Sequence, residues 1–259
     1  ATFFSILGRG GLENTLLRFI AQANARNQSA RLWSILRKGG ILVFTGASLA
    51  ALFAARLVPL LDIRLFHSLG LSAIVYFVSG WSALLALQFV AGEVFRGFQE
   101  IKWAVLFSGL VTALTSVLLL GLAVWMGITL VLTTVMVIVI LAMVASNGFA
   151  LLVLRHKLKA LPRDQDNQVS YGELLDHSWP LLINALTLFL LSQSDLWLLG
   201  TFASENEVAI YGATSRLVLL TAMSLGIVNA LVPPLIARMH AQNDTTRLEL
   251  LLRTVATLA

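Results

Sequence analysis

The chain has 259 residues, of which 58% are hydrophobic and 12% charged, with a mean hydropathy of +0.86. Soluble domains carry about 25% charged and roughly 45–50% apolar residues, so the composition excludes soluble enzymes, secreted disulfide scaffolds and nucleic-acid-binding modules. The net charge of +5 predicts basic loops on a membrane protein, and the lack of cysteine excludes thiol chemistry and CxxC metal sites.

Long apolar runs predict an all-α, polytopic transmembrane helical bundle. A bilayer core is about 30 Å thick and needs roughly 20 apolar residues per helix. The segment 103–154 has no Asp, Glu, Lys or Arg and would be roughly 78 Å long as one helix. We therefore predict a hairpin that turns at Trp125–Ile128, where Gly127 permits the reversal. The predicted spans are 3–25, 39–61, 69–92, the two arms of 103–154, 179–200 and 208–235.

Basic residues alternate between the loops and predict an orientation. Loops expected on one side carry thirteen Lys and Arg residues, and the opposite side carries two, Arg56 and Arg64. The positive-inside rule makes the first side cytoplasmic.

A short repeat predicts two equivalent bundles. Eight of the eighteen residues in 20–37 recur at a constant offset of 216 in 236–253, including Asn27, Arg31 and Arg37. Chance within a biased composition is the alternative explanation. Six crossings between the copies give both the same orientation, as in transporters built from parallel repeats of six or more helices each.

The repeat predicts a lobed organisation within a longer chain. We expect 1–154 to form most of an N-terminal lobe, 155–178 a cytoplasmic linker with a short interfacial helix at 171–177, and 179–259 the start of a C-terminal lobe. We also expect the sequence to be a fragment, because it starts at Ala1 and stops within a helical pattern.

Charged residues inside the spans are the candidate functional residues, because they are costly there and usually face a cavity or a partner. Asn14, Arg18 and Gln22 recur at i, i+4 spacing and predict a polar helix face. Arg18 has a planar fork suited to phosphate oxygens. A pair with Glu13, or snorkelling to the interface, is the structural alternative.

Two further charges lie in the last two predicted spans. We expect Asp195 and Arg216 to pair across that helical hairpin, as a static salt bridge or with Asp195 as a proton or cation coupling site, and Arg216 is a second cavity candidate. Asn184, eleven residues before Asp195, lies on the same helix face. Glu13 and Arg9 form a similar i, i+4 pair. The His residues have no metal-ligand spacing, so we predict neither a metal nor a cofactor.

Several motifs resemble the oligosaccharide flippases and polysaccharide export proteins of the multidrug/oligosaccharidyl-lipid/polysaccharide exporter superfamily. The similar segments are Gly11-Leu12 with Leu17-Arg18-Phe19-Ile20-Ala21, Trp179-Pro180-Leu181, Asp195 with Leu199-Gly200-Thr201-Phe202, Glu207-Val208-Ala209-Ile210-Tyr211 with Arg216-Leu217, and Pro234-Leu235-Ile236-Ala237. Ala209 departs from the usual glycine.

The resemblance implies helices two to eight of a non-enzymatic transporter in the bacterial inner membrane. It would flip undecaprenyl-diphosphate-linked oligosaccharide, the lipid-linked partner, by alternating access for surface polysaccharide such as the O-antigen of lipopolysaccharide. A glycan polymerase and glycosyltransferases of the same pathway are the protein partners implied. A cation-coupled multidrug or metabolite antiporter, and a membrane-embedded glycan polymerase, are the alternatives.

Overall fold

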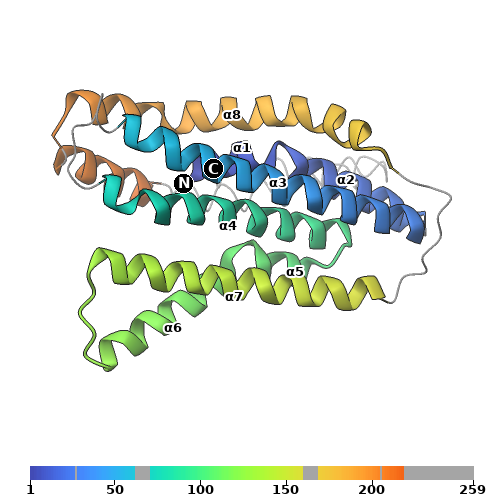
Figure 1. The fold of residues 1–259 in the computed structure, drawn as a ribbon, viewed down its shortest axis with the longest axis horizontal. Helices are drawn as coiled ribbons and strands as arrows, with labels where there is room; N and C mark the ends of the chain where they lie inside the picture. Colours follow the sequence, from blue (N-terminus) through green and yellow to red (C-terminus); the bar gives the residue numbers. More distant parts are fainter. Residues whose placement is uncertain (27, 62–70, 160–168, 205, 219–259) are drawn as a thin grey trace, which may run out of the picture. The chain divides into compact units, whose positions relative to one another are not determined.

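The computed structural model describes residues 1–26, 28–61, 71–159, 169–204 and 206–218. All regular structure within these ranges is helical, as predicted (Figure 1). The chain divides into two compact units, Ala1–Ser192 and Gln193–Ala259. The predicted lobe boundaries at 154 and 179 stay a prediction, since part of the linker lies outside the described residues.

Five helices of the described residues are long and apolar enough to cross a membrane: Ser29–Pro59, Val75–Gly97, Ile101–Trp125, Leu132–Leu158 and Tyr171–Phe202. They correspond to α3 (Ser29–Leu61), α4 (Leu71–Gly97), the run α5 (Ile101–Val105), η2 (Leu106–Leu110) and α6 (Val111–Trp125), then α7 (Leu132–Lys159) and α8 (Tyr171–Phe202). The predicted spans from 39 to 200 are confirmed as helices of spanning length. Most of the predicted span 208–235, and the second copy of the repeat, lie outside the described residues.

The first predicted span is a discontinuous helix rather than one rod. α1 (Thr2–Arg9) and α2 (Leu12–Ala25) are separated by Gly10 and Gly11, which have φ values of 59° and 75°. The Gly10 N–H donates to the carbonyls of Ile6 and Leu7, which ends α1. Two successive residues in the left-handed conformation redirect the chain. A residue with a Cβ atom would pay a steric free-energy cost in this conformation, whereas glycine does not.

The core of the first unit lies between α2, α3 and α4. Its fully buried side chains include Leu16 and Ile20 of α2, Ile35 and Val43 of α3. α1 crosses α3 where a Cβ atom on Gly46 would lie 2.5 Å from the Gly8 carbonyl oxygen. Such contacts between small residues are typical of helices that associate in lipid.

The described helix ends that border the predicted cytoplasmic loops of the first unit lie toward one end of that unit (Figure 1). Arg31 pairs with Glu173 at 3.2 Å, Lys38 Nζ donates to the Val169 carbonyl at 2.7 Å, and Lys157 pairs with Glu100. These bonds tie together the beginnings of α3, α5 and α8 and the end of α7.

The opposite end of the first unit contains the predicted hairpin turn. α6 ends at Trp125, Gly127 has a φ of 73°, and the Ile128 N–H donates to the Ala123 carbonyl at 2.9 Å. The position of the turn is confirmed. Residues 171–177, in contrast, are the first two turns of the continuous helix α8 and not a separate interfacial helix.

Candidate functional site

A polar strip runs along one face of α2. Asn14, Arg18 and Gln22 are exposed, whereas Leu16 and Ile20 on the other faces are buried. Within the described part of the chain, none of the three polar side chains has a hydrogen bond or ion pair. We refer to Asn14, Arg18 and Gln22 as the strip.

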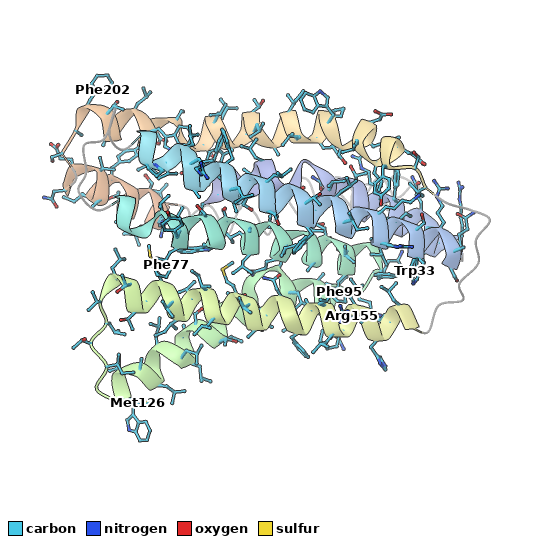
Figure 2. The ribbon with its side chains drawn as sticks, in the orientation of Figure 1. Trp33, Phe77, Phe95, Met126, Arg155 and Phe202 are labelled. Carbon is cyan, nitrogen blue, oxygen red and sulfur yellow. The ribbon has the colours of Figure 1, made fainter. Side chains whose placement is uncertain are left out.

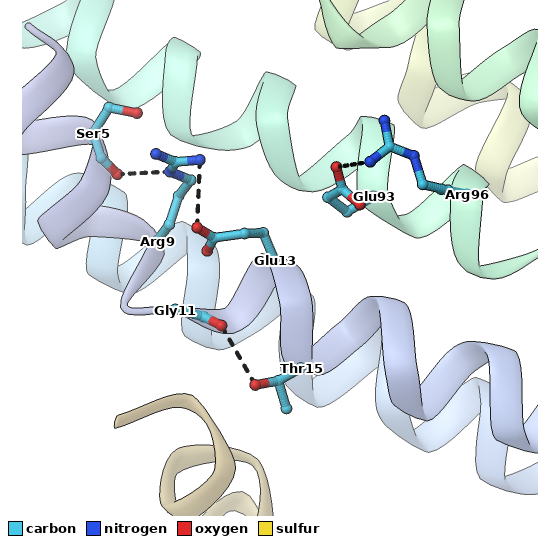
Figure 3. A network of polar contacts seen from close by, with 7 residues as sticks. All are labelled: Ser5, Arg9, Gly11, Glu13, Thr15, Glu93 and Arg96. Carbon is cyan, nitrogen blue, oxygen red and sulfur yellow. Dashed lines mark hydrogen bonds and ion pairs between the residues drawn. The ribbon is translucent and has the colours of Figure 1, made fainter. Parts of the chain in front are cut away.

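Glu13 does not pair with Arg18. Its carboxylate Oε1 lies 3.4 Å from Nη1 of Arg9, as the i, i+4 spacing predicts, and the two side chains are only 9% and 11% exposed. Arg9 Nε also donates to the Ser5 carbonyl at 3.3 Å, and its guanidinium lies 4.5 Å from the centre of the Phe89 ring. The pair spans the Gly10-Gly11 break (Figure 3).

A second carboxylate, Glu93 of α4, belongs to the same cluster. It interacts electrostatically with both Glu13 and Arg9, and its Oε1 lies 2.7 Å from Nη1 of Arg96 (Figure 3). The remaining oxygens, Oε2 of Glu13 and Oε2 of Glu93, are buried without a partner in the described chain. Charged residues inside a membrane bundle are costly, and they usually face a partner or a cavity.

Sequence reasoning missed Glu93 because the residue comes immediately after the apolar run 69–92, where the predicted span ends. α4 instead continues to Gly97, which keeps Glu93 inside a spanning helix. The spacing Glu93-Arg96 at i, i+3 was the available signal.

Asp195 lies in the second unit and forms a different bond from the one predicted. Its Oδ2 accepts a hydrogen bond from the Tyr211 hydroxyl at 2.7 Å, and no ion pair with Arg216 occurs among the described residues. Tyr211 and Asp195 are at similar distances along the chain from Ala203 and Ser204, where α8 has ended, but Arg216 is five residues deeper, roughly 7.5 Å along its helix. Arg216 and Asp195 are both exposed.

Asn184 projects from α8 with an exposed side chain, and no hydrogen bond joins it to the α2 strip in the described structure. α8 does contact α2 nearby: the Ser178 hydroxyl bonds the Thr15 hydroxyl at 2.9 Å. No group of three or more His, Asp or Glu side chains in the described ranges could hold a metal ion.

Comparison with known proteins gives one match. A family model described as "Polysaccharide biosynthesis protein" matches residues 1–240. No curated protein and no solved structure matches the chain.

Proposed function

This chain belongs to the polysaccharide biosynthesis protein family, and from that premise we propose that it is a transporter and not an enzyme. Its substrate would be an undecaprenyl-diphosphate-linked oligosaccharide, moved from the cytoplasmic to the periplasmic leaflet of a bacterial inner membrane. The glycan would serve surface polysaccharide such as O-antigen. Glycosyltransferases that build the glycan and a polymerase that extends it would act before and after this step.

The observation that carries the proposal is the exposed polar strip on α2. Other exposed helix faces of the first unit are strongly apolar, for example Phe44, Leu49 and Leu52 on α3. The strip is instead polar over about 12 Å of helix, the length of a diphosphate with one or two sugars. Arg18 would bind diphosphate oxygens through its planar fork, and the amides of Asn14 and Gln22 would bind sugar hydroxyls.

Two exposed residues outside the strip are further candidates. Asn184 of the first unit would supply an amide for sugar hydroxyls, and Arg216 of the second unit is a separate candidate cation for the anionic substrate. Alternating access would expose each of them to one leaflet at a time.

Energy coupling is assigned to carboxylates. Among the described residues, Glu13 has a buried carboxylate oxygen without a partner, and a proton would be taken up there. Asp195 is the second coupling candidate, and its bond to Tyr211 gives it an orientation. Asp195 lies in α8, one of the helices of spanning length, where a charged group is costly and usually faces a cavity or a partner.

Alanine substitution of Arg18 tests the proposal directly. We expect Arg18→Ala to abolish glycan export, because the diphosphate loses its charged partner, while the protein stays in the membrane in normal amounts. Lipid-linked glycan should accumulate on the cytoplasmic leaflet, which radiolabelled glycan and leaflet-selective digestion would measure. Arg216→Ala should have the same effect.

Arg26→Ala is the matched control, since Arg26 is also exposed on this segment but lies at the C-cap of α2. Export should continue in that variant. Normal export by both Arg18→Ala and Arg216→Ala would contradict the cavity role. Export of cationic drugs, with lipid-linked glycan unaffected, would indicate an antiporter.

A further inference from the structure

A long apolar groove lies on the first unit, away from the residues used above. Its volume is about 880 Å³, and α3, α4 and α7 form its walls with a single residue from α2. On α3 it extends from Trp33 to Thr45, which is roughly 18 Å of helix. The hydrocarbon depth of one leaflet is similar, about half of 30 Å.

Two glycines give the groove its width. Gly40 of α3 and Gly148 of α7 both line it, and a Cβ atom at either position would meet no atom within 4 Å. Apolar side chains such as Phe44 and Leu151 form the rest of its surface. A hydrocarbon chain fits this lining.

Two arginines lie at the end of the groove that is near the basic loops. Arg37 and Arg155 both line it, and the Arg37 guanidinium lies 5.5 Å from the centre of the Trp33 ring. Figure 2 shows Trp33 and Arg155 toward the same end of the first unit. Neither guanidinium forms an ion pair with a carboxylate of the described residues.

The other polar groups of the groove are already engaged. The Asn147 amide donates to the carbonyls of Leu84 and Met143, and the Thr45 hydroxyl donates to the Ile41 carbonyl of its own helix. Sugar hydroxyls would therefore find few partners here. This argues against the oligosaccharide carrier as the occupant and for a lipid with a small head group.

We propose that the groove binds an anionic phospholipid of the cytoplasmic leaflet, with its phosphate between Arg37 and Arg155 and one acyl chain beside Gly40 and Gly148. Charge complementarity selects the head group, since each basic side chain near the surface favours anionic lipid. The groove is about as long as one leaflet is deep, and its lining is apolar, so it suits an acyl chain. The site goes beyond the transport function and does not depend on it.

The test uses the full purified protein and measures lipid retained after detergent extraction by native mass spectrometry. The protein is titrated with phosphatidylglycerol and, separately, with phosphatidylethanolamine of the same chains. We expect preferential retention of phosphatidylglycerol. The variant R37Q/R155Q should lose about tenfold or more in apparent affinity for it, and R26Q should retain it.

Filling the groove tests the acyl-chain site. The variant G40L/G148L should lose both lipids, whereas G121L should keep them, because Gly121 also faces open space but lies on α6 outside the groove. If G40L/G148L does not fold, the loss of phosphatidylglycerol retention in R37Q/R155Q still tests the proposal. Equal retention of the two lipids by the unmodified protein overturns the proposal, as does unchanged retention in the variants.

Two competitors identify the occupant. Glycerol phosphate has the head-group chemistry without chains, and its displacement of phosphatidylglycerol at equal concentration would show that the groove itself is not used. Undecaprenyl phosphate that displaces phosphatidylglycerol at a much lower concentration would assign the groove to the carrier lipid and overturn the phospholipid assignment. Export assays are not needed for either result.

Discussion

Arg9 and Glu13 are buried charges that hold together a discontinuous helix. Their ion pair spans the Gly10-Gly11 break, and Phe89 covers the guanidinium. Removal of one partner leaves the other charge buried without compensation, which is more costly than removal of both. The pair therefore stabilises the break between α1 and α2.

The first prediction concerns this pair. Glu13→Gln should destabilise the purified protein by about 3–5 kcal/mol, because Arg9 keeps its charge in an apolar site, and Arg9→Met/Glu13→Gln should recover part of the loss. Thermal unfolding of the single and double variants gives the coupling energy. Additive effects of the two changes would mean that the pair does not stabilise the fold.

Glu207 is a second residue with a defined local role. Its carboxylate accepts hydrogen bonds from the Ser204 N–H at 2.9 Å and the Ser204 hydroxyl at 2.8 Å, which is half of a capping box at the start of the helix 206–218. The Ser204 N–H, followed by its hydroxyl, lowers the pKa of this carboxyl from its ordinary 4.5.

The lowered pKa predicts a pH effect with a definite sign. The carboxylate stabilises the helix start at neutral pH, and this contribution is lost as the pH falls below 4.5 through the lowered pKa. Amide hydrogen exchange at 206–210 should therefore lose protection in acid, after correction for intrinsic rates. Glu207→Ala should show the low protection already at neutral pH, and a pH-independent difference between the two proteins would contradict the role.

At the scale of the element, α2 is a helix whose faces have different partners. One face packs into the core through Leu16 and Ile20, and the opposite face is the polar strip. The chain enters α2 through Gly11, whose backbone lies against α8: a Cβ atom there would be 2.3 Å from the Ser178 carbonyl oxygen and 2.6 Å from the Leu182 nitrogen.

The two glycines of the break form a matched pair for a substitution test. Gly10→Ala should cost about 1–2 kcal/mol of stability, since only its left-handed φ opposes the change, and a Cβ atom there meets nothing within 4 Å. Gly11→Ala should cost roughly 1–3 kcal/mol more, because the methyl group forces α2 and α8 apart. Thermal unfolding compares the two, and equal losses would show that the contact with α8 yields easily.

For the molecule as a whole, the charges of the loops predict the orientation. The ends of helices that carry the thirteen basic residues, as far as they are described, are joined by polar contacts of Arg31, Lys38 and Lys157. Their common side is the one that the positive-inside rule assigns to the cytoplasm.

Single cysteines would measure this orientation, because the chain has none of its own. Met126→Cys and Ser204→Cys should react with an impermeant maleimide in cells with a permeabilised outer membrane. Arg26→Cys and Lys157→Cys should react only after the inner membrane is opened. Labelling of all four from outside would contradict the predicted topology.

Much of the fold could be predicted from patterns of neighbouring residues, whereas much of the candidate site could not. Apolar length located the spans, and glycine with tryptophan located the hairpin turn at Trp125–Ile128. The polar strip followed from helical periodicity in the same way. The Tyr211 bond to Asp195 did not, because the register of two helices depends on the turn between them. Glu93 was missed because α4 continues past the apolar run 69–92 to Gly97.

The sequence alone indicated that the protein lies in lipid rather than in water, and it located the helices from 39 to 200. It also predicted which side of the membrane carries the basic loops, and it indicated the family. Composition, apolar run length and motif spacing are all properties of contiguous residues. Tertiary structure alone decided that the first span breaks at Gly10-Gly11, that Glu93 joins Arg9 and Glu13, and that Gly40 and Gly148 open a groove beside Arg37 and Arg155. Each of these depends on which helices approach one another and at what register. Helix packing in lipid sets that approach through small residues and paired charges, and no single segment of the chain specifies it.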